Sequence, residues 1–177
     1  VRRAIDLAAG GLTVEVNVSG ASIGDETLLH DIERWIAASG ADPSRLVFEI
    51  TETAVIADEQ AGRRFVDLVH RLGCKVALDD FGTGYSGFAY LKQLPVDYLK
   101  IDMEFVRDMS TSPTSRHVVE AVVSLARGFG LTTIAEGVED TETVELLIGL
   151  GVDHAQGFHL GRPAPLPPLT AAADAKA

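Results

Sequence analysis

Two carboxylates stand side by side in the stretch VALDDFGTGYSG, residues 76 to 87, at the point where a short apolar strand should end. They are Asp79 and Asp80. Adjacent like charges raise each other's pKa unless cations lie between them, and carboxylate oxygens are the ligands that Mg²⁺, Mn²⁺ and Ca²⁺ prefer. The pair is therefore suited to hold two hard cations, with one carboxylate shared between them. Two cations roughly 3.5–4 Å apart are a known device for hydrolysing phosphoesters.

Other polar residues lie at or near the carboxyl ends of further predicted strands. They are Asn17, Glu49, Lys100, Glu136 and Gln156. One carboxylate at such a place is often only a cap for the next helix, but Glu49, Glu136 and the two adjacent aspartates would bring four negative charges into one pocket. Without metal ions, their pKa values would have to rise. The set therefore predicts a site for hard cations, with the side-chain oxygen of Asn17 as a neutral ligand.

Lys100 belongs to the same set but allows two interpretations. Beside bound cations it could orient an attacking water, help to take up its proton, or neutralise charge on a phosphate. It could equally form a structural ion pair with Asp80 or Asp102. The spacing of the residues leaves both interpretations open.

The elements that must position these residues alternate along the chain. Nearly continuous apolar runs predict strands, and amphipathic segments closed by glycine predict helices. The predicted strands are 12–17, 45–52, 75–80, 96–102, 131–137 and 152–158. The predicted helices are 25–40, 58–73, 115–130 and 140–151, with a short one near 86–93. This alternation indicates a parallel sheet covered by helices.

Two architectures have such a sheet: an open doubly wound α/β fold and a TIM-like (β/α) barrel. In a barrel all strand ends converge on one mouth, whereas in an open sheet only those at the switch point can cooperate. Polar residues at six strand ends favour the barrel. A complete barrel has eight strands and typically ~250 residues, so a chain of 177 residues predicts an incomplete barrel with about six of the eight. We expect this domain at 1–165, lacking its N-terminal strands because Val1 already lies in a helical pattern, and a flexible Pro- and Ala-rich tail at 166–177.

Composition excludes several classes of function. With 26 acidic and 15 basic residues, the net charge of -11 argues against binding a DNA or RNA duplex, which requires a basic surface. Cys74 is the only cysteine, so the chain has neither a disulfide framework nor a thiolate zinc site. No run approaches the roughly 20 apolar residues of a membrane span, and no signal peptide is visible. These features predict a cytoplasmic chain, alone or as part of a membrane-anchored multidomain protein.

Six short motifs, in order and with similar spacing, resemble those of EAL-domain proteins, which are bacterial cyclic di-GMP phosphodiesterases built on a (β/α) barrel. The motifs are NVS (17–19), FEITE (48–52), DDFGTGYSG (79–87), LKID (99–102), AEGVE (135–139) and QGFHLGRP (156–163). The resemblance extends from Val1 to about Pro165. It implies metal-dependent cleavage of one phosphodiester bond of cyclic di-GMP, which gives linear pGpG.

The resemblance also implies a role for each matching residue. Two Mg²⁺ or Mn²⁺ ions would be held by Asn17, Glu49, Asp79, Asp80 and Glu136. Ca²⁺ would inhibit, because its longer and looser coordination misplaces the water. Lys100 and Glu136 would position the catalytic water. Glu52, with Thr51, would anchor the glycine-rich loop that follows the aspartates, which would fold over the metals. The residues expected to contact the substrate are Asn17, Gln156 and Arg162.

The chain departs from the family at one point, because no Glu-Ala-Leu motif precedes NVS. In the family, the glutamate of that motif is a metal ligand. We therefore expect an active parent domain and an impaired isolated fragment. The alternative is a catalytically inactive EAL module that binds cyclic di-GMP or another protein, and an enolase-like lyase is a distant third reading. The expected partners besides cyclic di-GMP are a second copy of the chain, in a homodimer, and an upstream sensor or diguanylate cyclase domain.

Overall fold

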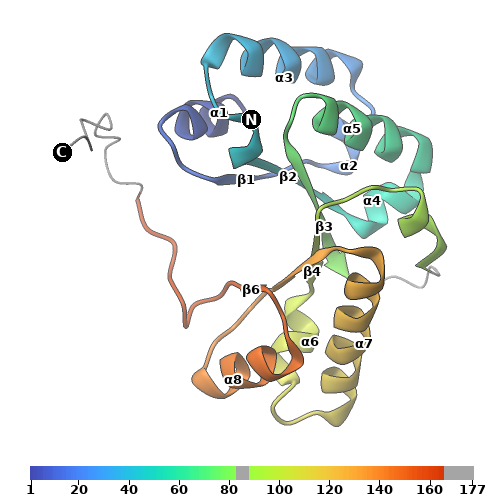
Figure 1. Ribbon diagram of the computed structural model, residues 1–177, viewed down its shortest axis with the longest axis vertical. Helices are drawn as coiled ribbons and strands as arrows, with labels where there is room; N and C mark the ends of the chain where they lie inside the picture. The colour runs from blue at the N-terminus through green and yellow to red at the C-terminus, as the bar shows by residue number, and fades with distance from the viewer. Residues whose placement is uncertain (83–87, 166–177) are drawn as a thin grey trace.

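Six parallel strands form one sheet, in which each strand pairs with the next in chain order (Figure 1). The computed structural model describes residues 1–82 and 88–165. The strands are β1 (Val14–Asn17), β2 (Leu46–Thr51), β3 (Lys75–Phe81), β4 (Tyr98–Ile101), β5 (Thr132–Ala135) and β6 (His154–Ala155). Parallel strands in sequential order, joined by helical crossovers, are the arrangement of a (β/α) barrel. The predicted incomplete barrel is confirmed.

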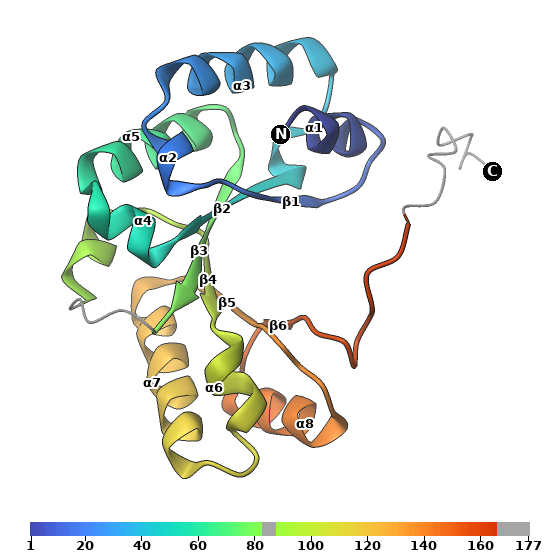
Figure 2. The same cartoon turned by 180° about the vertical axis from the view of Figure 1, so that it is seen from behind.

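Helices cover the outer side of this curved sheet, and β1 and β6 form its two edges (Figure 2). The helices are α1 (Arg2–Ala9), α2 (Gly20–Ile23), α3 (Glu26–Ser39), α4 (Glu52–Ala57), α5 (Glu59–Arg71), α6 (Met103–Asp108), α7 (Pro113–Phe129) and α8 (Thr141–Leu150). Two 3-10 turns, η1 (Pro43–Arg45) and η2 (Phe88–Lys92), complete the described elements. In the ranges that the structure describes, no helix is both long and apolar enough to cross a membrane.

Polar caps and glycines set the ends of the longer helices. The side chain of Asp25 accepts hydrogen bonds from the backbone at the start of α3, and Asp140 does the same for α8. Gly40 and Gly151 end these helices in the left-handed conformation, which glycine adopts without steric cost. The helix boundaries predicted from the sequence rest on the same residues.

One predicted element was wrong in extent, and some short helices were missed. The final strand was expected over 152–158 but comprises only His154 and Ala155, because the chain then hydrogen-bonds to the loop around Val138 instead of continuing along β5. The short helices α4 and α6 were not predicted. They begin where Thr51 and Asp102, at the ends of their strands, cap the next turn with their side chains.

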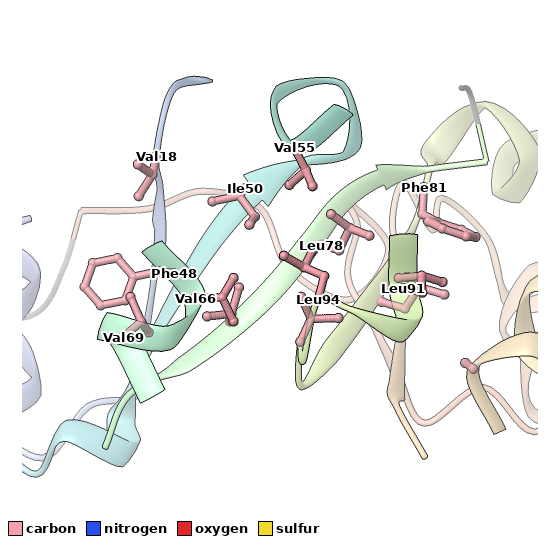
Figure 3. Packing of buried hydrophobic residues seen from close by; sticks show 14 of the residues in the cluster. Val18, Phe48, Ile50, Val55, Val66, Val69, Leu78, Phe81, Leu91 and Leu94 are labelled. Carbon is pink, nitrogen blue, oxygen red and sulfur yellow. The ribbon is translucent and has the colours of Figure 1, made fainter. Parts of the chain in front are cut away.

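One face of each inner strand packs against the helices. Phe48 and Ile50 of β2 lie near Val66 and Val69 of α5 (Figure 3), and the ring of Phe48 meets that of Phe65 edge to face at 5.9 Å between centroids. Successive side chains of a strand point to opposite faces. Since the apolar residues anchor the outer face, the residues between them face the inside of the barrel, and these carry the polar groups.

Candidate active site

A buried ammonium group joins three carboxylates from different strands. The Nζ atom of Lys100, whose side chain is 3% exposed, lies 2.7 Å from Oε1 of Glu136, 2.9 Å from Oε1 of Glu49 and 3.1 Å from Oδ1 of Asp79. Glu49 comes from β2, Asp79 from β3 and Lys100 from β4, while Glu136 directly follows β5. Four consecutive strands thus deliver charged groups to one point inside the sheet.

Strand alternation explains why these residues converge. Glu49 lies between Phe48 and Ile50, and Lys100 lies between Leu99 and Ile101, all of which are buried in the apolar core. With those neighbours turned outward, Glu49 and Lys100 must point inward. The parallel register then brings the ends of adjacent strands to a common level.

Asp80 breaks the alternation. In a regular strand it would point away from Asp79, but its φ of 56° is in the left-handed region, and the pairing of β3 with β4 shifts register between Leu78 and Phe81. Its backbone N–H donates to Oδ1 of Asp79 at 3.0 Å. Left-handed backbone costs a residue other than glycine roughly 1–2 kcal/mol and is often found at functional sites. Here it allows two consecutive carboxylates to serve one site.

Asp79, Asp80 and Glu136 meet closely enough to share a cation. One ligand oxygen from each lies within 4.8 Å of the others. Glu49 joins them through Lys100, and its Oε1 atom is buried and accepts no well-aligned hydrogen bond, although the ammonium is within ion-pair distance. A set of carboxylate oxygens with one unsatisfied member fits a hard cation such as Mg²⁺ or Mn²⁺.

The electrostatics of the cluster point the same way. Burial raises the pKa of Glu49 to about 7, against the opposing effect of Lys100. Burial likewise raises the pKa of Glu136, and both burial and the charge of Asp79 raise that of Asp80. Burial alone would lower the pKa of Lys100, but its carboxylate partners raise it, so the ammonium stays charged. One ammonium is not enough for this many carboxylates, and further positive charge would stabilise them.

The other residues predicted for the site lie at its rim. Gln156 is exposed, and its Nε2 atom donates to Oε1 of Glu136 at 2.6 Å. Asn17 is exposed at the end of β1, in register with Glu49. Arg162 lies further out, with its guanidinium carbon 4.9 Å from the centroid of the Phe158 ring. Gln156 thus contacts the cluster directly, Asn17 pairs in register with Glu49, and Arg162 lines the same cavity as Glu136.

Glu52 lies beneath the site at the start of α4. It is 2% exposed, and its Oε2 atom accepts a hydrogen bond from the backbone N–H of Gly82 at 3.3 Å. Gly82 has a φ of 103°, a conformation that favours glycine. Glu52 therefore contacts the chain just beyond Asp80. The glycine-rich loop that was expected to fold over the metals lies, at 83–87, outside the described residues.

The sequence interpretation missed Glu15, which interacts with Glu49 and helps to raise its pKa. It stands two residues before Asn17 in β1, on the same face of the strand. The period of two along that strand was the available signal, because it places Glu15 on the inner face together with Asn17.

The chain matches the EAL domain family over residues 2–163. The cyclic di-GMP phosphodiesterase PdeB of Shewanella oneidensis is 36% identical over 153 residues, which cover 86% of this chain and 18% of PdeB. PdeL of Escherichia coli, also named a cyclic di-GMP phosphodiesterase, is 44% identical over 126 residues, covering 71% of this chain and 35% of PdeL. The chain thus spans about a fifth to a third of the length of these curated relatives.

Solved structures show the same relationship. The PaMucR phosphodiesterase in complex with c-di-GMP has a TM-score of 0.85 and 32% identity, and the match covers 93% of this chain and 71% of that one. BlrP1 of Klebsiella pneumoniae, in complexes with c-di-GMP and either calcium or manganese, has a TM-score of 0.83 and 33% identity, covering 92% of this chain and 43% of BlrP1. With a match over nearly its whole described length, the chain belongs to the EAL-domain family.

Proposed function

We propose that the domain to which this chain belongs hydrolyses one phosphodiester bond of cyclic di-GMP and releases linear pGpG, with two Mg²⁺ or Mn²⁺ ions as cofactors, and that this chain alone is impaired. The observation that carries the proposal is the convergence of Glu49, Asp79 and Glu136 within 3.1 Å of Lys100, with Asp80 beside them. The relatives named cyclic di-GMP phosphodiesterases and the c-di-GMP complex of PaMucR support it.

The residues that would hold the ions are the acidic cluster and its neutral neighbour. They are Asn17, Glu49, Asp79, Asp80 and Glu136. When bound, the ions supply Lewis-acid stabilisation of the phosphate oxygens and a more acidic water. Ca²⁺ prefers longer and more variable coordination, so the same proposal makes it a binder that inhibits turnover.

Lys100 would act as a fixed positive charge. Its carboxylate neighbours keep it protonated, so it is suited to orient the attacking water and to neutralise charge on the phosphate rather than to act as a base. Glu136 accepts hydrogen bonds from both Lys100 and Gln156 at Oε1. This arrangement leaves its second oxygen to position the water, while Gln156 faces the substrate together with Asn17 and Arg162.

Glu52 would hold the start of the loop that follows the aspartates. Its hydrogen bond from Gly82 fixes the backbone two residues beyond Asp80. Because Asp80 depends on an unusual backbone conformation to reach the site, a fixed anchor just after it keeps both aspartates in place. Thr51 contributes by capping α4, which carries Glu52.

Product analysis tests the proposal. The protein as encoded, and the 177-residue chain alone, are incubated with cyclic di-GMP in Mn²⁺, in Ca²⁺ and in a chelator, and products are separated by chromatography and identified by mass. We expect pGpG from the encoded protein in Mn²⁺, little in Ca²⁺ and none in chelator. Binding of cyclic di-GMP without product in Mn²⁺ would instead favour the alternative, an inactive binding module. Full turnover by the 177-residue chain would contradict the expected impairment.

The wider assembly belongs to the same proposal. Because the curated relatives are about three to six times as long as the matched segment, we propose that this chain adjoins a regulatory region such as a sensor or a diguanylate cyclase domain. A bifunctional diguanylate cyclase/cyclic di-GMP phosphodiesterase, MucR of Pseudomonas aeruginosa, is 35% identical over 158 residues. We further propose that the domain works as a homodimer in the bacterial cytoplasm, which sedimentation and cell fractionation would test.

A further inference from the structure

We infer that the buried hydroxyl of Tyr90 donates a hydrogen bond to Glu52 and thereby positions Asp80, an inference that rests on the proposed function. Glu52 already accepts a hydrogen bond from the backbone N–H of Gly82, two residues after Asp80. Tyr90 lies on η2. A bond from Tyr90 would therefore tie one carboxylate to the chain on both sides of residues 83–87. Tyr90 would be a positioning residue, because it acts through Glu52.

The hydroxyl of Tyr90 is an unused donor. Tyr90 is 8% exposed, and its hydroxyl oxygen is buried without a well-aligned hydrogen bond to any described residue. Leaving a hydroxyl buried and unpaired costs stability, and most buried polar groups have a partner. Tyr98 shows the contrast, since its hydroxyl accepts a hydrogen bond from Nζ of Lys75 at 3.3 Å. The hydroxyl of Tyr90 therefore needs an acceptor nearby.

Packing places Tyr90 against the helix that carries Glu52. Tyr90 and Val55 line one small cavity between η2, α4 and α5. Val55 lies three residues after Glu52, so the two side chains share a face of α4. Leu91 and Leu94, which follow Tyr90 in the chain, belong to the same apolar cluster as Val55 (Figure 3). The core thus holds the tyrosine ring beside the first turn of α4.

Protonation and charge make the two side chains complementary. Burial and then the charge of Glu52 raise the pKa of Tyr90, so the hydroxyl keeps its proton and can donate. Glu52 is 2% exposed, and a carboxylate has two acceptor oxygens. Gly82 supplies one donor, 3.3 Å from Oε2, and a buried charge needs further hydrogen bonds to offset its loss of hydration. Because a hydroxyl hydrogen can rotate toward its acceptor, Tyr90 can supply the second donor.

Asp80 is the residue that gains from a second anchor. Its φ of 56° is one that residues other than glycine avoid, and the pairing of β3 with β4 shifts register around it. Regular strand pairing does not maintain either feature, so the chain after Asp80 must be held from outside the sheet. A carboxylate held by both Tyr90 and Gly82 is less free to turn away. Asp80 then keeps the orientation that the proposed metal site requires.

A double-mutant cycle tests the contact and its role. Wild-type encoded protein, Tyr90→Phe, Glu52→Gln and the double variant are compared by urea unfolding in a chelator, and by kcat, KM and the Mn²⁺ concentration that gives half the maximal rate. Tyr90→Phe should lower kcat about tenfold, the scale of one hydrogen bond to a charged group. It should also raise the Mn²⁺ requirement, while KM for cyclic di-GMP stays the same. In stability and in log kcat, the double variant should lose less than the sum of the two single losses, because both changes weaken one contact.

Tyr98→Phe is the matched control, because it removes a hydroxyl that contacts Lys75 rather than Glu52. Its kcat and its Mn²⁺ requirement should equal those of wild type. The inference is overturned if Tyr90→Phe behaves as this control does, or if the two single losses add in full in the double variant. A fall in kcat that only follows a smaller folded fraction, seen by circular dichroism, would also overturn the positioning role. If wild-type protein forms no pGpG, the proposed function has failed and the positioning role with it, whereas the unfolding cycle decides separately whether the hydrogen bond exists.

Discussion

Replacing Lys100 by methionine should destabilise the metal-free protein strongly. Methionine has nearly the same length and volume, so the change removes the charge without opening a cavity. At about 3 Å and an effective dielectric constant of about 20, each ammonium–carboxylate contact amounts to roughly 5 kcal/mol of attraction, much of which desolvation cancels. Removing one partner of a buried ion pair typically costs 3–5 kcal/mol. Since Glu49, Asp79 and Glu136 all lose their common cation, we expect a loss of about 4 kcal/mol.

Urea unfolding in a chelator measures this loss as a difference in the free energy of unfolding. Loss of Lys100 raises the pKa of Glu49 above its value of about 7, and protonation of that carboxyl would relieve the variant, so the loss should be larger in alkaline buffer than near neutral pH. Lys92→Met, at an exposed lysine on η2, is the control and should change stability by less than about 0.5 kcal/mol. Mn²⁺ should restore part of the loss. A loss in Lys100→Met below about 1 kcal/mol, or equal to that of the control, would refute the claim that Lys100 holds the cluster together.

Three further predictions concern other parts of the molecule. Glu52→Gln should lower kcat in Mn²⁺ about tenfold or more, because it weakens the hydrogen bond that the side chain of Glu52 accepts from the backbone N–H of Gly82. A kcat equal to that of a Glu59→Gln control would count against the role of Glu52 as an anchor of the chain after Asp80. Asp153→Asn should cost roughly 1 kcal/mol at pH 7 after allowance for its exposure, since Asp153 accepts from Thr133 N and Oγ1 at 2.8 and 2.7 Å. These bonds lower the pKa of Asp153, so its contribution to stability is present above the unfolded pKa of about 4 and is lost as the pH falls through the folded pKa. The difference in the free energy of unfolding between wild type and variant should therefore shrink in acid. A difference that grows in acid would contradict this prediction. Gly151→Ala should destabilise the protein by about 1–2 kcal/mol, because the φ of Gly151 is 76° and the new Cβ would meet Arg127. Gly149→Ala, within α8, places its Cβ in open space and should stabilise the protein slightly. Thermal melting that gave the reverse order of stability would refute this prediction.

The fold could be predicted from the sequence because its signals are local. Apolar runs such as that of β2, and glycines such as Gly40 and Gly151, mark strands and helix ends without knowledge of the tertiary structure. The short final strand could not be predicted. It ends early because residues around Gln156 bond to the loop at Val138, a contact between segments far apart in the sequence.

The sequence predicted that Glu49, Asp79 and Glu136 would lie close together, but not how they are arranged. Strand ends converge in a barrel, which was enough to place Glu49, Asp79 and Glu136 together. The central place of Lys100 depends on side-chain directions from several strands. The sequence offered Asp80 or Asp102 as its ion-pair partner, whereas its Nζ atom lies within 3.1 Å of Glu49, Asp79 and Glu136. The left-handed backbone of Asp80 leaves no mark in the sequence, since aspartate adopts many conformations.

Anomalous diffraction at the manganese edge tests the central claim most directly. Crystals of the protein grown with Mn²⁺ and cyclic di-GMP should show two peaks roughly 3.5–4 Å apart, ligated by oxygens of Glu49, Asp79, Asp80 and Glu136. Peaks at other places, or a cluster that stays free of manganese while cyclic di-GMP is bound and cleaved, would contradict the account.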